Sequence, residues 1–291
     1  TGTSLYAGHS LTQTASQTLS TTGTKAYAGQ SSSRGNIVVI GNEEDSTNGI
    51  SSGAVYVINN TTGALIRTIY EPEDPDNNHN FGRSVSYNGD KIATTSHTGN
   101  VYIFEASSGN LLNTFANANT SSGVTHTLDV SLTSNTVLFA TKYQNLGGGT
   151  NSGAYFQYDL NSNAILSYGK GGSGSVVTNE VAATDDYALQ LTTIGSGNTS
   201  IAVKTESGTT ARTISWSDGA TFGYGTNAGS IDAAGNILVA GSPGNDYPGT
   251  DTEIGEGAVR VYNFETGTLL HTLFHPDGSA NSTAFGTQVS T

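Results

Sequence analysis

The sequence GEGAVRVYNFETGTLLHTLFHPDGSANSTAFGTQVST, residues 255–291, decides the fold. Residues 258–262 alternate apolar and polar side chains as a β-strand does, residues 265–267 supply a turn, and residues 268–274 form a second strand. A Pro-Asp-Gly loop follows, and residues 285–290 resemble the first strand of a further unit. The same order of strands and turns recurs at least four more times upstream, which predicts an array of repeats.

Each repeat is predicted to contain four strands. In the first repeat they fall at residues 28–33, 36–41, 53–58 and 64–70. The third strand of the repeats begins near Gly53, Asn100, Gly153, Asn198 and Gly257, at intervals of 47, 53, 45 and 59 residues. Four-stranded units with a period of about 40 to 60 residues indicate a β-propeller, in which each unit is one blade. The sequence therefore predicts an all-β protein with a single propeller domain of antiparallel blades.

The predicted blades cover residues 25–70, 80–116, 120–170, 173–216 and 219–275. Residues 283–291 then supply the first strand of a last blade, and residues 1–24 supply its partners, which closes the ring. This arrangement predicts six blades. A seventh remains open if the long stretch from Thr120 to Ser175, or the N-terminal segment, holds another degenerate repeat.

The residues expected to carry this closure are Phe285, Gly286 and Val289 at the C-terminal side and Leu5 and Tyr6 at the N-terminal side. A second interpretation uses the same residues differently. The last strand would pair with the N-terminal segment of a neighbouring molecule and polymerise the protein head to tail. In both interpretations the predicted partner is this same chain, within one molecule or between molecules. Other surface or virion proteins are the alternative partners.

The composition narrows the function classes. The chain has 291 residues, 38 Gly, no Cys and a net charge of −13, from 23 acidic and 10 basic residues. This acidic balance disfavours binding to nucleic acid or to an anionic membrane, because both need a basic surface. No apolar run is long enough for a membrane-spanning helix. Thr1 cannot be a translation start, so the N-terminus is expected to be processed or cut from a longer chain, which suits an exported or virion-borne protein.

Phe222-Gly223 followed by Gly241-Ser242-Pro243 and Gly257-Ala258 resembles the FG-GAP repeat propellers, a family that includes integrin α-subunit heads and many bacterial and phage surface proteins. Phe81-Gly82 and Phe285-Gly286 carry the first half of the motif. The resemblance implies a propeller that works outside the cell, at the cell surface or on a virion. It does not fix a function, because propellers host many unrelated roles.

Two acidic loops lie between the second and third strands of their repeats, so both are expected on the same rim of the ring. They contain the calcium candidates Glu43, Glu44, Asp45, Asp246, Asp251, Glu253 and Glu256. Carboxylates and loop carbonyls are the ligands that Ca²⁺ prefers. The alternative is a pair of solvated loops without a metal. No other cofactor is expected.

The aromatic residues suggest packing more than binding. Tyr56, Tyr102, Tyr155 and Tyr262 fall at corresponding places in the third strands, to within one residue for Tyr155, which marks a site of contact between blades. Trp216 and tyrosines at the rim could stack on sugars, so glycans remain possible partners.

No nucleophile elbow, phosphate loop or dinucleotide fingerprint is present, so the protein is predicted not to be an enzyme. The favoured function is an extracellular or virion structural or adhesion propeller that displays loops or self-assembles through its terminal strands. A carbohydrate-binding propeller is the alternative. A propeller glycosidase or lyase is the third reading, and it would need two carboxylates that converge at the axial mouth.

Overall fold

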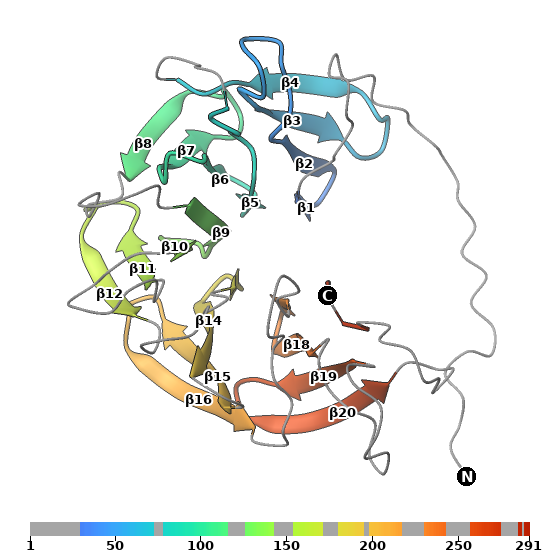
Figure 1. The fold of residues 1–291 in the computed structure, drawn as a ribbon, viewed down its shortest axis with the longest axis vertical. Coiled ribbons are helices and arrows are strands. Elements are labelled where there is room, and N and C mark those ends of the chain that lie inside the picture. The colour runs from blue at the N-terminus through green and yellow to red at the C-terminus, as the bar shows by residue number, and fades with distance from the viewer. Residues whose placement is uncertain are drawn as a thin grey trace, which may run out of the picture.

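The structure is a computed structural model that describes residues 30–72, 78–115, 126–142, 154–170, 180–194, 198–216, 230–242, 257–274, 285–286 and 288–291. These residues form twenty β-strands in five four-stranded antiparallel sheets, and none of them lies in a helix. None of these residues therefore belongs to a helix that could span a membrane. Figure 1 shows the sheets around a common centre as an open arc, a propeller-like arrangement with the first strand of each sheet innermost.

The strands of each sheet follow the chain from the centre outward. The first sheet contains β1 (Ser31–Arg34), β2 (Ile37–Asn42), β3 (Ala54–Asn59) and β4 (Leu65–Ile69), and the second contains β5 (Val85–Tyr87), β6 (Lys91–Thr95), β7 (Val101–Glu105) and β8 (Leu111–Phe115). The third contains β9 (His126–Leu132), β10 (Thr136–Lys142), β11 (Ala154–Asp159) and β12 (Ile165–Lys170). The fourth contains β13 (Val181–Ala183), β14 (Tyr187–Ile194), β15 (Asn198–Thr205) and β16 (Thr210–Trp216), and the fifth contains β17 (Ile231–Ala234), β18 (Ile237–Ser242), β19 (Ala258–Asn263) and β20 (Thr268–Phe274).

The core lies between neighbouring sheets. The two middle strands of a sheet carry apolar residues on both faces, because each face packs against another sheet. Val39, Val55 and Val57 of the first sheet, for example, pack against Ile92 and Tyr102 of the second. Similar clusters join the second sheet to the third, the third to the fourth and the fourth to the fifth. The apolar strands that repeat along the sequence therefore reflect sheets stacked face to face.

The innermost strands do not lie where the Phe-Gly pairs predicted them. Phe81 and Phe285 were expected to begin an inner strand, yet each forms a parallel bridge to the preceding sheet, Phe81 with Gly53 and Phe285 with Gly257. The inner strand β5 begins four residues after Phe81. The first repeat also differs, since its inner strand is β1 and not residues 28–33. Phe222-Gly223 and Val176-Val177 lie outside the described residues, and the inner strands of their sheets are β17 and β13.

Candidate functional site

The innermost strands of successive sheets are joined by side-chain oxygens that accept backbone N–H groups. Ser32 Oγ accepts the N–H of Tyr87 at 3.0 Å, and Ser86 Oγ accepts that of Leu132 at 3.0 Å. At the equivalent place after the fifth sheet, Asp232 Oδ2 accepts the N–H of Thr291 at 2.7 Å. Thr291 therefore stands where Tyr87 and Leu132 stand in their own inner strands.

A second layer of the same kind lies two residues earlier in each strand. Ser84 Oγ accepts the N–H of Val130 at 3.1 Å, Asp129 Oδ2 accepts that of Val181 at 2.9 Å, and Ser230 Oγ accepts that of Val289 at 3.3 Å. Two layers of hydrogen bonds in the same register place residues 289–291 beside β17, as β5 lies beside β1 and β9 beside β5, and the C-terminus lies near the centre of the arc (Figure 1). Residues 289–291 belong to none of the five described sheets.

The Phe-Gly pair before this strand is seated like its counterpart on the first sheet. A Cβ atom on Gly41 would lie 1.9 Å from the carbonyl oxygen of Gly82, and a Cβ atom on Gly241 would lie 1.9 Å from that of Gly286. Both contacts need a residue without a side chain. Gly286 thus contacts the fifth sheet in the same way as Gly82, at the start of the second sheet, contacts the first.

The outer strand of the fifth sheet is more exposed than its counterparts at one apolar position. Ile69, Phe115 and Ile214 hold the same register in β4, β8 and β16, and each is 5% exposed because the next sheet covers it. Leu273 holds that register in β20 and is 43% exposed. We call the surface formed by Val239, Val261 and Leu273 the open face of the fifth sheet.

The opposite end of the arc carries a second apolar face, whose residues on β3 are buried. Ala54, Tyr56 and Ile58 of β3 form a cluster with Val38 and Ile40 of β2. In the fifth sheet, the equivalent residues Leu238, Ala240 and Tyr262 pack on the preceding, fourth sheet. The first sheet therefore carries, at this end of the arc, the face by which the fifth sheet packs on the sheet before it.

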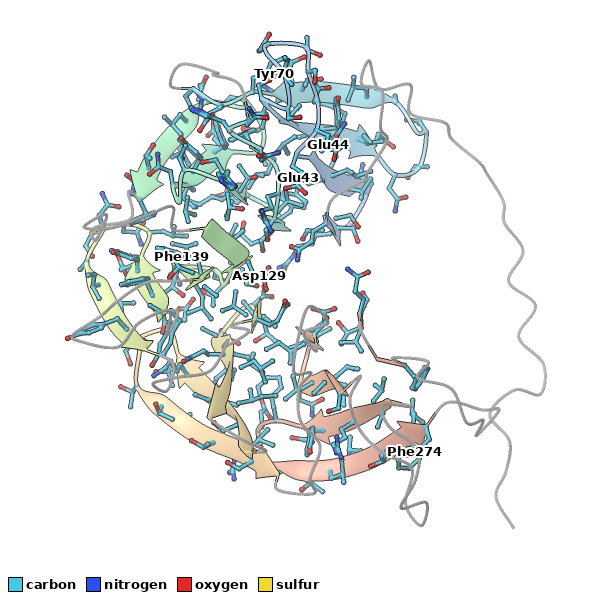
Figure 2. All side chains as sticks on the ribbon, in the orientation of Figure 1. Glu43, Glu44, Tyr70, Asp129, Phe139 and Phe274 are labelled. Carbon is cyan, nitrogen blue, oxygen red and sulfur yellow. The ribbon has the colours of Figure 1, made fainter. Side chains whose placement is uncertain are left out.

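Two carboxyl groups meet on the inner side of the ring. Asp129 lies at the centre-facing edge of the third sheet, as Figure 2 shows. Its Oδ1 accepts the hydroxyl of Ser84 at 3.0 Å and the N–H of Val130 at 2.9 Å. Burial raises the pKa of Asp129. Burial also raises the pKa of Glu180 well above its ordinary value, helped by the charge of Asp129 and a hydrogen bond with it.

This pair is the nearest approach to the two converging carboxylates that a glycosidase or lyase would need. Both oxygens of Asp129 are already occupied by donors from three sheets. A carboxylate held in this way joins the sheets. Because the pKa of Glu180 is raised, Glu180 keeps its proton and donates it in a hydrogen bond to Asp129. The arrangement can therefore hold a proton and fix the inner strands.

An ion pair joins the first and fourth sheets, which are not neighbours in the arc. Arg34, the last residue of β1, donates from Nη1 and Nη2 to the two carboxylate oxygens of Asp185 at 2.5 and 2.9 Å. Asp185 lies in the turn after β13 of the fourth sheet. The guanidinium of Arg34 lowers the pKa of Asp185 by its hydrogen bonds first and by its charge second. Because both side chains are half-exposed, the pair contributes orientation more than stability.

Two carboxylates of the acidic loop of the first sheet, those of Glu43 and Asp45, have partners within the protein. Asp45 Oδ1 accepts the N–H of Thr47 at 2.9 Å, and Asp45 Oδ2 accepts the hydroxyl of Tyr56 at 2.5 Å. Glu43 lies 3.9 Å from Arg83. Figure 2 shows Glu43 and Glu44 on the first-sheet side of the ring. Among the described residues no three His, Cys, Asp or Glu side chains are grouped to hold a metal ion.

The remaining candidates divide between described and undescribed residues. Asp246, Asp251, Glu253 and Glu256 of the second acidic loop lie outside the described residues, as do Leu5 and Tyr6. Phe285, Gly286 and Val289 are described and gather beside the fifth sheet. Sequence reasoning missed Ser32, Asp232 and Leu273. The signal for the first two is a Ser or Asp three residues before the Gly of the first turn in the repeat, at Gly35 and Gly235.

Comparison with known proteins supports the fold alone. No family model matches the sequence, and no curated protein matches it. Among solved structures, the chain is similar to the computationally designed Ika8 protein, with a TM-score of 0.51 and 16% sequence identity over 87% of this chain. The match covers 62% of the Ika8 chain, so this chain spans less than two thirds of that protein. The all-β, multi-sheet architecture is thus shared with a solved protein of unrelated sequence.

Proposed function

We propose that the protein is a non-enzymatic structural or adhesion propeller of six blades, acting outside the cell or on a virion. The observation that carries the proposal is the register of residues 289–291. These residues repeat the two inner-strand hydrogen bonds of the described sheets. A first strand in place and an apolar face beside it, centred on Leu273, are what a sixth blade needs.

The structural role is supported by where the polar side chains act. Ser32, Ser84 and Asp129 each accept a hydrogen bond from a backbone N–H of the next sheet. Polar side chains that hold neighbouring sheets together suit a scaffold, which presents loops at its rims or assembles through its ends. The resemblance to FG-GAP repeats supports the same role and an extracellular or virion setting.

The proposal is tested by comparing Leu273→Asp with Leu270→Asp. Both leucines lie on β20 and each is 43% exposed. Leu270 corresponds to Ile66 and Leu112, which are exposed although their sheets do have a following neighbour. It is therefore the matched control. The readouts are urea unfolding, followed by the fluorescence of Trp216, and solution mass by light scattering.

If a sixth blade covers Leu273, Leu273→Asp buries a charge without a partner. The variant should then lower the free energy of unfolding by about 2–3 kcal/mol or change the solution mass of the protein. Leu270→Asp is expected to stay within about 0.5 kcal/mol of the unmodified protein. Equal behaviour of the two variants would contradict a sixth blade in this position.

A further inference from the structure

Gln157 of β11 is a buried amide at a place where the other described sheets are apolar. It pairs with Leu138 of β10, and its exposed fraction is 0%. The residues at the same register in the other sheets are Val57, Ile103, Val203 and Val261. Burying an amide is less favourable than burying valine, because its polar atoms must give up water and find partners in the core. The packing of the third sheet therefore does not by itself explain the glutamine.

Each polar atom of the Gln157 side chain has a partner. Its Nε2 donates to Thr136 Oγ1 at 3.3 Å and to the backbone carbonyl of Thr205, in the fourth sheet, at 3.1 Å. Its Oε1 accepts the hydroxyl of Ser167 on β12 at 3.3 Å. Because a backbone carbonyl can only accept, the contact with Thr205 fixes the side of the amide on which the nitrogen lies. Thr136 Oγ1 therefore contacts the carboxamide at its nitrogen, which is bonded to the carbonyl carbon Cδ.

A chain of hydroxyl groups leads from Thr136 to a carboxylate. Thr133 Oγ1 lies 2.9 Å from Thr136 Oγ1 and donates to Glu206 Oε1 at 2.9 Å. Because the hydrogen of the Thr133 hydroxyl goes to Glu206, the hydroxyl of Thr136 is the donor in its contact with Thr133. Asn135 holds the carboxylate of Glu206 in place through its backbone N–H at 3.0 Å and its Nδ2 at 2.8 Å. The Thr136 proton thus has a path to a base, as a nucleophilic hydroxyl requires.

Among the five described sheets, the third alone combines these groups. The counterparts of Thr136 at the start of the second strand are Ile37, Lys91, Tyr187 and Ile237. No other described sheet therefore places both a hydroxyl and a carboxamide at the two positions of Thr136 and Gln157. The pair is a particular feature of one sheet and not part of the repeat.

We propose that Thr136 and Gln157 join in an ester between Oγ1 and Cδ, which crosslinks β10 to β11. A lone pair of Thr136 Oγ1 attacks Gln157 Cδ, and the hydroxyl proton passes through Thr133 to Glu206. The negative charge that develops on Gln157 Oε1 is stabilised by the hydroxyl of Ser167. The bond from Cδ to Nε2 then breaks, and Nε2 takes the proton back from Glu206 and leaves as ammonia. One hydroxyl and one carboxamide become one ester and one ammonia, so the step needs no oxidant or reductant.

The reaction requires the folded protein. Thr136, Gln157 and Ser167 lie on three strands of the third sheet, and Glu206 lies in the turn after β15 of the fourth. The groups therefore meet only when both sheets have formed and packed together. Thr136 and Gln157 both have an exposed fraction of 0%, so the ester would be protected from hydrolysis by water. The crosslink is a single reaction of the chain with itself, and it does not depend on a sixth blade.

The first test is mass spectrometry of the unmodified full chain. The ester makes the intact mass smaller than that of the sequence by the mass of one ammonia. Trypsin cuts after Lys91, Lys142 and Lys170, so it places Thr136 in residues 92–142 and Gln157 in residues 143–170. The proposal expects these two peptides to stay joined in urea and to separate in alkaline hydroxylamine, which cleaves esters and leaves amides intact. Two separate peptides before hydroxylamine would overturn the crosslink, even with ammonia lost elsewhere in the chain.

The second test separates the proton path from mere packing. Glu206→Gln keeps an oxygen that accepts the Thr133 hydroxyl but removes the base, so crosslinking after cell-free synthesis should slow by about a hundredfold or more. Glu206→Asp keeps a carboxylate and should recover part of the rate. Gln157→Val is the matched control, because valine occupies this register in the first sheet; it should fold and keep the full mass of its sequence. A Glu206→Gln variant that crosslinks at the unmodified rate would overturn the role of Glu206.

Discussion

Asp129 Oδ2 accepts the backbone N–H of Val181 at 2.9 Å, and through this bond the third sheet holds the inner strand of the fourth. The other carboxyl oxygen of Asp129 accepts the hydroxyl of Ser84 from the second sheet at 3.0 Å. One buried side chain therefore ties three consecutive sheets at the inner edge of the ring. The joint between Ser32 and Tyr87, by comparison, links two sheets through one oxygen.

Asp129→Asn is expected to lower the free energy of unfolding by about 1–3 kcal/mol, because the amide NH₂ would face a buried N–H donor. Urea unfolding followed by Trp216 fluorescence measures the change. Asp90→Asn is the control, since Asp90 is largely exposed beside Lys91 and should cost less than about 1 kcal/mol. If the two variants lowered the free energy of unfolding equally, Asp129 would not be joining the three sheets.

Glu180 predicts a pH dependence of stability. Its pKa lies well above the ordinary value of 4.5 in the folded protein, because burial, and then Asp129, favour the neutral acid. Above pH 4.5 the folded state therefore binds more protons than the unfolded state, and the free energy of unfolding falls as the pH rises through the folded pKa. Each unit by which the pKa is raised corresponds to about 1.4 kcal/mol.

Glu180→Gln isolates this effect. Glutamine resembles the neutral acid, so the variant should match the unmodified protein near pH 4.5 and become the more stable of the two as the pH rises. Urea unfolding at intervals between that pH and neutrality gives the difference curve. Asp185, whose pKa Arg34 lowers, acts in the opposite direction below its ordinary value of 3.8, outside this range. A flat difference curve would show that Glu180 ionises normally in the folded state.

The middle strands could be predicted from the sequence because both of their faces are buried. Val55 and Val57 face one neighbouring sheet, and Tyr56 and Ile58 belong to the other face. Such strands need β-branched and aromatic residues throughout, and these runs repeat visibly along the chain. The five four-stranded antiparallel sheets follow from this repetition.

The inner strands could not be placed in the same way. β1 reads Ser-Ser-Ser-Arg, and β5 is only three residues long. These strands face the axis and are held through side-chain oxygens, so their sequence lacks an apolar alternation. The Phe-Gly pairs were the stronger signal nearby, and they mark a contact with the preceding sheet instead.

The tyrosine correspondence was right in the first two sheets and wrong in the fifth. Tyr56 and Tyr102 hold the same register and donate to buried carboxylates, Asp45 and Glu71. In the fifth sheet the residue at that register is Arg260, while Tyr262 lies two positions further along β19. Spacing between aromatic residues alone could not reveal this shift, because both positions are buried and alternate onto the same face.

Two close glycine contacts can be compared, Gly41 with Gly82 between the first and second sheets and Gly241 with Gly286 beside the fifth sheet. Gly41→Ala would drive a Cβ atom to 1.9 Å from the carbonyl oxygen of Gly82, between two complete sheets. We expect it to cost more than about 2 kcal/mol, because backbone must move in a packed core. Gly35→Ala is the control: Gly35 has a φ of +60° and nothing within 4 Å of its Cβ position, so only the backbone penalty of about 1 kcal/mol applies.

Gly241→Ala makes the same contact with Gly286, which precedes the strand of the sixth position. Because this change displaces residues 285–291, amide hydrogen exchange in a peptide covering them should accelerate at least about tenfold, while the exchange of β18 and β19 changes little. Exchange of residues 285–291 that matches Gly35→Ala would mean that the seat on Gly241 does not hold this segment. An effect spread over the whole chain would instead show that residues 285–291 stabilise the ring as strongly as the second sheet stabilises the first.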